Sequence, residues 1–332
     1  MELLKLKEIK NVYSIVQLDT SLLVSDKKGI LNYHQFDNLT LKFKIEENIS
    51  VIDTIKHHSN YYFISTRSKL FVQIKNEIVP FLNEFLCVDS LKVKNYIVLY
   101  QGDIEYQKNS IYSLTKKQIL WSLENISLCV IGDYCFSRKK SNFKARNIET
   151  GEVLWDKTIT DDFPESTGYN FLTVYNKVLV MAIKDTTLAG YDVDTGELLW
   201  SVKKTNNQNL LMDNDGKLRG ISITSYFETD IQTGVYRRVE FAPYEAFNEP
   251  GFFSSERDNF VIIDNHIITT DFYSNRIGAF NMETQQYDWF YTEENATGFP
   301  ASRPIKYFEP YLCLIDNKDT LHIYEVRKQE HV

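Results

Sequence analysis

Two stretches of the chain, RNIETGEVLW at residues 146–155 and YDVDTGELLW at residues 191–200, repeat nearly the same ten residues. Each contains a Thr-Gly pair and ends on one of the four tryptophans of the chain. Because glycine tolerates positive φ and Asp hydrogen-bonds its own turn, the pair predicts a tight hairpin between two strands. The ring on the second strand then predicts a contact with a neighbouring repeat, and its burial contributes roughly 2–4 kcal/mol.

All four tryptophans occupy this one repeat position. Successive tryptophans are separated by 34, 45 and 89 residues, and the segment TDIQTGVYRRVEF divides the longest interval, with an arginine in the tryptophan position. A period of roughly 40–45 residues built from short strands is typical of β-propeller blades. The repeat position is taken, in chain order, by Phe43, Phe81, Trp121, Trp155, Trp200, Arg238 and Trp289, and the turn glycines are Gly151, Gly196 and Gly234.

The pattern predicts an all-β fold, a single β-propeller domain over residues 1–332 made of four-stranded antiparallel blades. Seven repeats and a closing blade make eight blades, and seven is the alternative because the first two repeats match weakly. Residues 1–9, MELLKLKEI, follow the pattern of an outer strand, whereas the C-terminal segment lacks a final strand. The N-terminal strand is therefore expected to complete the last blade, which closes the ring and removes two sheet edges.

The repeated stretches resemble the repeat of the PQQ-like (quinoprotein alcohol dehydrogenase-like) β-propellers, over about residues 110–295. The resemblance implies four-stranded blades around a central channel. Quinone enzymes of that family are longer and carry a vicinal disulfide over the cofactor and an Asp base beside a calcium ion. This chain has no adjacent cysteines. We therefore expect it to lack the catalytic features of the quinone enzymes and to bind neither a quinone nor another cofactor.

Composition excludes several classes of function. The net charge of −8 and the absence of a basic run argue against nucleic-acid binding. No 18-residue apolar run occurs, so no membrane span is predicted. The four cysteines lie in apolar runs and form no CxxC pair, which indicates buried free thiols in a reducing compartment. A cytoplasmic location is the resulting expectation.

Motifs for chemistry are weak. His57 and His58 are the one histidine pair, but adjacent side chains on a strand point to opposite faces, so we interpret the pair as a surface turn and predict no metal site. The segment DNDGK at 213–217 is interpreted as a turn and not a calcium loop. No GxSxG or phosphate-binding loop is present. A catalytic triad assembled in space stays open.

Three enlarged links between repeats, at 158–171, 240–259 and 292–304, are the candidate binding regions. Each holds a glycine followed by an aromatic residue, together with carboxylates. The alternative for these pairs is that they simply begin an inner strand. Long loops in a compact fold usually carry function or are mobile. The candidate binding residues are Tyr244, Phe247, Glu249, Phe252, Phe253, Glu256, Asp161, Asp162, Tyr169 and Phe299.

Aromatic anchors with an acidic rim suit a basic protein surface. We therefore expect a non-catalytic protein-binding propeller, either an interaction scaffold or an immunity-type inhibitor, that uses this acidic, aromatic loop face. The partner is expected to be another protein, of basic character. The alternative is a hydrolase or lyase with an active site at the mouth of the channel, because a fold alone does not determine function.

Overall fold

The structure is a computed structural model that describes residues 1–18, 21–26, 30–35, 41–46, 51–57, 60–65, 69–74, 77–89, 95–102, 107–166, 168–184, 186–203, 210–222, 224–240, 252, 259–271, 273–300, 303 and 305–327. Contacts divide the chain into two compact units. Unit 1 comprises Met1–Val12, Asp185–Thr187 and Val202–Val332, and unit 2 comprises Tyr13–Lys184 and Leu188–Ser201. The single domain expected from the sequence stays a prediction.

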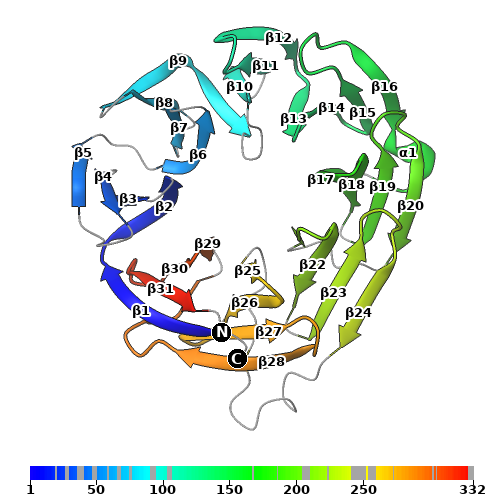
Figure 1. Cartoon of the computed structure of the whole chain (residues 1–332). Helices are drawn as coiled ribbons and strands as arrows, with labels where there is room; N and C mark the ends of the chain where they lie inside the picture. Colours follow the sequence, from blue (N-terminus) through cyan, green and yellow to red (C-terminus); the bar gives the residue numbers. More distant parts are fainter. Residues whose placement is uncertain are drawn as a thin grey trace. The chain divides into compact units, whose positions relative to one another are not determined.

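The described chain is almost entirely β-structure, as predicted, and its strands form antiparallel sheets (Figure 1). The strands that fall mainly in unit 2 are β2 (Val12–Leu18), β3 (Ser21–Asp26), β4 (Ile30–Gln35), β5 (Leu41–Glu46), β6 (Val51–His57), β7 (Asn60–Ser65), β8 (Lys69–Ile74), β9 (Glu77–Asp89), β10 (Tyr96–Gly102), β11 (Gln107–Ser113), β12 (Gln118–Glu124), β13 (Ser127–Ile131), β14 (Tyr134–Lys139), β15 (Asn142–Arg146), β16 (Val153–Thr158), β17 (Tyr169–Tyr175), β18 (Val178–Ile183), β19 (Thr187–Asp192) and β20 (Leu198–Lys203). A short helix, α1 (Ile159–Asp162), follows β16.

The remaining strands belong to unit 1. They are β1 (Glu2–Ile9), β21 (Leu211–Met212), β22 (Lys217–Ile221), β23 (Ser225–Asp230), β24 (Tyr236–Glu240), β25 (Phe260–Ile263), β26 (His266–Thr270), β27 (Arg276–Asn281), β28 (Gln286–Thr292), β29 (Lys306–Phe308), β30 (Tyr311–Ile315) and β31 (Leu321–Arg327). Among the described residues, no helix is long and apolar enough to cross a membrane.

Most sheets are four-stranded and follow chain order, as in β2-β3-β4-β5, β13-β14-β15-β16, β17-β18-β19-β20, β21-β22-β23-β24 and β25-β26-β27-β28. Strands β6 to β12 instead share one seven-stranded sheet. Its long strand β9 pairs with β8 from Glu77 to Leu86 and with β10 from Leu86 to Asp89. Two four-stranded meanders thus share one strand there, and the expected number of eight blades stays a prediction.

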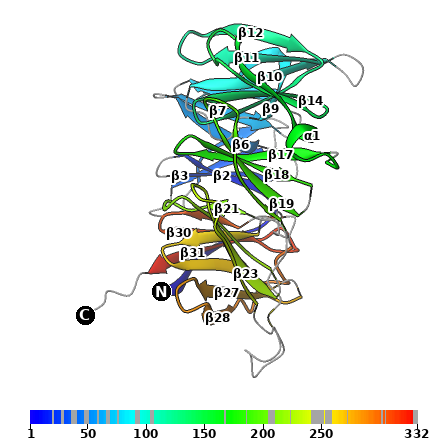
Figure 2. The same ribbon diagram turned by 90° about the vertical axis from the view of Figure 1, so that its right-hand side faces the viewer.

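The N-terminal strand completes the C-terminal sheet, as expected from the sequence. Strand β1 pairs antiparallel with β31, from Glu2 opposite Arg327 to Ile9 opposite Leu321, in a sheet ordered β1-β31-β30-β29. The blue β1 runs beside the red β31 in both views (Figures 1 and 2). Since β1 covers the edge of β31, the backbone groups of the last strand are paired and not left to template another chain.

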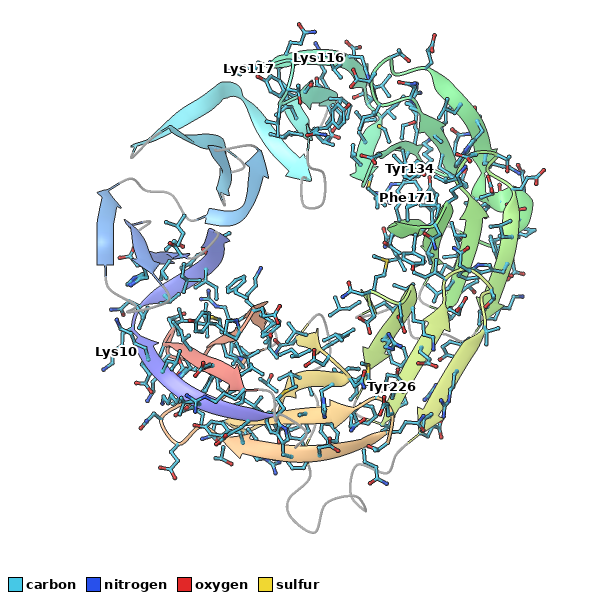
Figure 3. All side chains as sticks on the ribbon, viewed as in Figure 1. Lys10, Lys116, Lys117, Tyr134, Phe171 and Tyr226 are labelled. Atoms are coloured by element: carbon cyan, nitrogen blue, oxygen red, sulfur yellow. The ribbon has the colours of Figure 1, made fainter. Side chains whose placement is uncertain are left out.

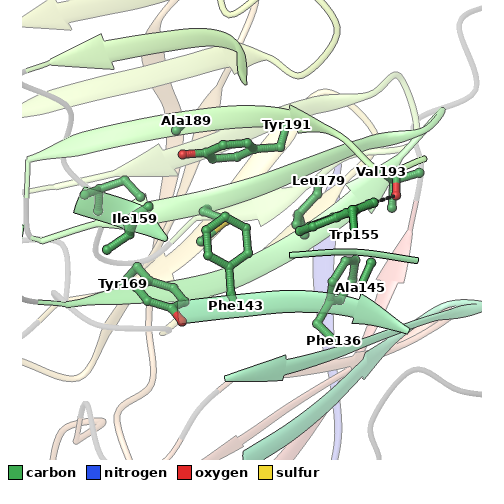
Figure 4. Packing of buried hydrophobic residues seen from close by; sticks show 12 residues of the cluster. Phe136, Phe143, Ala145, Trp155, Ile159, Tyr169, Leu179, Ala189, Tyr191 and Val193 are labelled. Atoms are coloured by element: carbon green, nitrogen blue, oxygen red, sulfur yellow. Dashed lines mark hydrogen bonds between the residues drawn. The ribbon is translucent and has the colours of Figure 1, made fainter. Parts of the chain in front are cut away.

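In unit 2 a hydrophobic core lies between the sheet β13–β16 and the sheet β17–β20 (Figure 4). Phe143 lies at its centre and contacts Trp155 edge-on, with ring centroids 5.6 Å apart. Tyr134 and Phe171, both labelled in Figure 3, are partly buried and pack against this core. Edge-to-face aromatic contacts of this kind add to the free energy of simple burial.

The repeated tryptophan contacts the turn of the following sheet in the two cases that lie within unit 2. Trp121 Nε1 donates to the carbonyl oxygen of Ile148 at 2.8 Å. Trp155 Nε1 donates to the carbonyl oxygen of Val193, also at 2.8 Å (Figure 4). Each ring also lies against the glycine that follows the accepting residue by three positions in the same turn. A Cβ built on that glycine would stand 2.8 Å from the ring. The glycines of these turns are Gly151 and Gly196, with φ of +76° and +75°.

Trp289 lies at the same repeat position but has no such turn to contact. It packs against the core between β25–β28 and the terminal sheet. The outer strands of that sheet, β31 and β1, come from opposite ends of the chain, so no turn joins them. Among the residues that the structure describes, the buried Nε1 of Trp289 has no hydrogen-bond partner. The chain ends therefore replace one of the repeated turns.

The residue that opens each turn is Asp or Asn because either side chain can accept the same backbone hydrogen bonds. Asp192 Oδ1 accepts from the backbone N–H groups of Asp194 and Thr195 at 2.9 and 2.8 Å. Asn147 Oδ1 accepts from the equivalent N–H groups of Glu149 and Thr150. The bond from Thr195 holds the pKa of Asp192 below its usual value, since it favours the carboxylate.

We expect Asp192→Asn to make unfolding less sensitive to acid. A depressed pKa stabilises the fold at pH values above the unfolded pKa of about 3.9, and that contribution is lost as the pH falls through the folded value. Asparagine keeps the hydrogen bonds and does not titrate, so the free energy of unfolding at neutral pH should change by less than about 0.5 kcal/mol. Urea unfolding of both proteins at neutral pH and near pH 3 measures the effect. Asn147→Asp should increase acid sensitivity, and equal pH dependence in all three proteins would contradict the assignment.

In the turn at 213–217, the negative charge of the aspartates is neutralised by an arginine of the protein itself. This agrees with the interpretation of the segment as a turn and not a calcium loop. The guanidinium of the buried Arg219 donates to Asp213 Oδ2 at 2.5 Å and to both carboxylate oxygens of Asp215 at 2.8 and 2.6 Å. These bonds hold the pKa of Asp215 below its usual value. Because arginine binds a carboxylate in a planar, bidentate way, it supplies the charge that a cation would otherwise supply.

Two of the described cysteines, Cys135 and Cys313, are buried thiols, as the sequence analysis expected, and Cys129 is half-buried. Cys129, Cys135 and Cys313 form no disulfide. Cys129 lies opposite Phe136 on the neighbouring strand, so the side chain of Cys135 points to the other face of the sheet. Burial raises the pKa of Cys135 to about 12 and also raises that of Cys313, which keeps both thiols protonated and unreactive.

Candidate binding surfaces

In the link after β16, one acidic residue supports the fold and two others are exposed to solvent. Ile159 of α1 is buried in the core between the two sheets of unit 2. Asp162 is half-buried and accepts a hydrogen bond from the hydroxyl of Tyr191 at 3.1 Å. Asp161 and Glu165 are exposed to solvent. Of the two predicted aspartates, only Asp161 therefore presents a free acidic surface.

Tyr169 is a core residue and not a contact residue. It begins β17 and is 4% exposed. Its hydroxyl donates to the carbonyl oxygen of Asn142 at 2.9 Å, and its ring packs against Phe143 with centroids 5.5 Å apart. Arg138 covers the ring and donates to the Tyr169 carbonyl oxygen. The sequence analysis left open the alternative that a Gly-aromatic pair starts an inner strand. Tyr169 fits that alternative.

Phe252 and Phe299 also require correction as predicted contact residues, since they are 2% and 3% exposed. The ring of Phe252 packs against both Tyr287 and Phe290, with centroids 5.1 and 4.9 Å away. The ring of Phe299 meets the imidazole of His322 edge-on at 5.9 Å. Burying these rings removes apolar area from water within unit 1, so they stabilise the fold and leave no ring for a partner.

The other predicted contact residues lie outside the described residues, and their roles stay predictions. They are Tyr244, Phe247, Glu249, Phe253 and Glu256.

Exposed aliphatic side chains on the outer strands of unit 2 are a feature that the sequence analysis missed. Val153 and Leu154 of β16 are 46% and 59% exposed, and Leu199 of β20 is 49% exposed. Side chains alternate across a strand, so the residue before each inward tryptophan points away from the core. That alternation was the available signal for Leu154 and Leu199.

A polar cluster joins the two ends of the chain in unit 1. Lys5 of β1 donates to Glu8 Oε1 and to Glu293 Oε1, both at 2.6 Å. Glu293, which follows β28, also accepts from the hydroxyl of Tyr324 on β31 at 2.7 Å. His322 of β31 has its Nδ1 3.5 Å from Glu8 Oε1. The sequence held no local signal for this cluster, because Lys5 and Glu293 are 288 residues apart.

The arrangement of antiparallel four-stranded sheets agrees with solved propellers. BamB from Moraxella catarrhalis superposes with a TM-score of 0.63 at 12% identity, over 98% of this chain and 100% of that one. The computationally designed Ika8 protein gives 0.64 at 13% identity, covering 97% and 98%. Sqt1 of Saccharomyces cerevisiae gives 0.64 at 10%, covering 98% of each chain. At these identities the likeness establishes the fold, and the protein is a β-propeller.

The repeat family follows from the sequence match. Residues 108–222 match the PQQ_2 family, described as outer membrane protein assembly factor BamB. The repeats in residues 108–222 are PQQ-like, as their resemblance implied. No curated protein sequence matches it significantly.

Proposed function

We propose that this PQQ-like propeller is a non-catalytic protein that binds another protein. The observation that carries the proposal is the exposure of Val153, Leu154 and Leu199 on the outer strands of neighbouring sheets. Apolar side chains gathered on a surface mark interaction sites, because a partner that covers them removes them from water. In unit 2, Trp121 and Trp155 contact the next sheet within the protein. Leu154, beside Trp155, points outward and remains accessible to a partner.

The partner that suits this surface best is a basic protein. The chain carries a net charge of −8, and Asp161 and Glu165 present free carboxylates on the link after β16. Complementary charge speeds association and selects partners. An immunity-type inhibitor that covers a basic protein is the finer form of the proposal. The acidic, aromatic link at 240–259 is proposed as a further part of the binding surface.

Affinity capture from a lysate of the native host tests the proposal. The intact protein should retain one stoichiometric partner, and Leu154→Asp/Leu199→Asp should reduce capture at least about tenfold if these side chains lie near the centre of the interface. Asp161→Lys/Glu165→Lys should weaken capture and reduce its salt dependence. Glu124→Lys/Glu197→Lys makes the same charge change at other exposed positions and should retain the partner.

Circular dichroism of each variant checks that the fold is kept. Equal capture by the folded Leu154→Asp/Leu199→Asp variant would remove the outer strands from the interface. No partner for the intact protein would reject the proposal and favour the alternative, an enzyme with its site at the channel mouth.

A further inference from the structure

We infer that Glu8, Glu293 and His322 form a binding site for one divalent transition-metal ion, with Zn²⁺ as the reference ion. One ligand atom of each residue lies within 4.8 Å of the ligand atoms of the other two. The residues come from β1, from the link after β28 and from β31, all within unit 1. Two carboxylates and one imidazole are a donor set that zinc accepts in proteins.

His322 has a buried nitrogen atom whose hydrogen-bonding capacity the surrounding ion pairs do not satisfy. Its side chain is fully buried, and its Nε2 lies 3.3 Å from Asp316 Oδ2. In the neutral tautomer whose Nε2–H donates to Asp316, Nδ1 carries a lone pair. Among the described residues, Nδ1 makes no hydrogen bond, and Glu8 Oε1 lies 3.5 Å away. His322 is fully buried and Glu8 is partly exposed, and two acceptors that face each other in this way require a cation or a proton between them.

Asp316 stands where the outer carboxylate of a metal-bound histidine usually stands. Such a carboxylate fixes the tautomer of the imidazole and orients its free nitrogen toward the metal. Glu293 is held in a similar way. The hydroxyl of Tyr324 donates to its Oε2, and Oε1 accepts from Lys5 and from the backbone N–H of Asn295 at 3.2 Å. Two of the three ligands are therefore oriented by neighbours on their far side.

Lys5 holds the cation position in the absence of metal. Its ammonium lies 2.6 Å from one oxygen of Glu8 and 2.6 Å from one oxygen of Glu293, so it offsets one of their two negative charges. It does not hydrogen-bond His322. The Lys5 side chain is 26% exposed, so the ammonium can move into water when an ion enters. Ligand atoms around tetrahedral zinc stand about 3.3 Å apart, which requires only a small closure of the three side chains.

A metal at this position would join the first strand of the chain to the last strand and to the β28–β29 link. The ion binds only where both chain ends are in place, so it stabilises the folded form according to its concentration and affinity. This inference does not rest on the proposed protein-binding function, because its ligands belong to unit 1, whereas Leu154 and Leu199 belong to unit 2.

Zinc titration of the full-length chain, after treatment with EDTA, tests the site. Calorimetry should detect one Zn²⁺ per chain, and the thermal midpoint should rise with added Zn²⁺. Glu8→Gln should weaken binding at least about tenfold, as loss of a ligand or its support does. Lys5→Met removes the competing ammonium and should strengthen binding about tenfold or more, an effect opposite to that expected if Lys5 merely supports the fold.

His266→Gln is the matched control, because His266 also pairs through Nε2 with a carboxylate, that of Asp288 at 2.7 Å, and lies in the same unit. It should leave zinc affinity unchanged. Absence of stoichiometric binding in the intact protein would overturn the site, as would equal affinity in Glu8→Gln or no gain in Lys5→Met. The test uses the half-exposed Glu8 and Lys5, so it does not depend on a His322 variant that fails to fold.

Discussion

Gly190→Ala is expected to destabilise the protein by about 3 kcal/mol or more, at the upper end of the cost of overpacking a core. A Cβ on Gly190 would lie 2.2 Å from Cε2 and 2.4 Å from Nε1 of Trp200, far inside contact distance. Gly190 lies on β19 among buried residues, and Trp200 lies on the adjacent strand β20. The methyl group therefore has to displace the indole or separate the two strands.

Urea unfolding followed by circular dichroism measures this cost. Gly168→Ala is the matched control, because a Cβ there meets nothing within 4 Å, and its effect should stay within about 0.5 kcal/mol or be slightly stabilising. Trp200→Leu should partly rescue Gly190→Ala, since it removes the ring that the methyl strikes. The close approach would be contradicted if Gly190→Ala and Gly168→Ala changed the free energy of unfolding equally. It would also be contradicted if the losses from Gly190→Ala and Trp200→Leu simply added in the double variant.

Trp155→Ala is the second large effect, with an expected loss of about 3–5 kcal/mol in the free energy of unfolding. The ring is 9% exposed, packs against Phe143 and lies against Gly196 of the next sheet. The substitution removes this contact area and leaves the Val193 carbonyl oxygen without its indole donor. Trp155→Phe keeps most of the area, so its smaller cost, about 1–3 kcal/mol, measures mainly the lost hydrogen bond.

Leu154→Ala serves as the control for Trp155→Ala. Leu154 is the adjacent residue on the same strand but is 59% exposed, so its substitution should change stability by less than about 0.5 kcal/mol. Chemical unfolding of the three variants and the unsubstituted protein gives the comparison. If Leu154→Ala cost as much as Trp155→Ala, the outward orientation of Leu154 and the inward orientation of Trp155 would both be wrong.

The candidate binding residues show how far sequence reasoning reached. The sequence analysis placed Tyr169, Phe252 and Phe299 in links between repeats, but their rings turned out to be buried. An aromatic residue after a glycine in a link has the same local signature whether it faces a partner or a core. Only the neighbouring sheet decides between these outcomes, and in the sequence that neighbour is many residues away.

The sequence alone determined the features that depend on local chemistry. The Thr-Gly turns, the alternation of outer strands and the missing last strand predicted four-stranded sheets and the pairing of β1 with β31. Period-2 alternation and turn chemistry act within about ten residues, so they can be seen in any repeat.

The tertiary structure decided which distant groups meet. It placed Trp121 and Trp155 under the turn of the following sheet, with the turn glycine leaving room for the ring. It also brought Glu8, Glu293 and His322 within 4.8 Å of one another. These contacts arise because packed sheets bring together residues from different strands, and no spacing along the chain encodes that geometry.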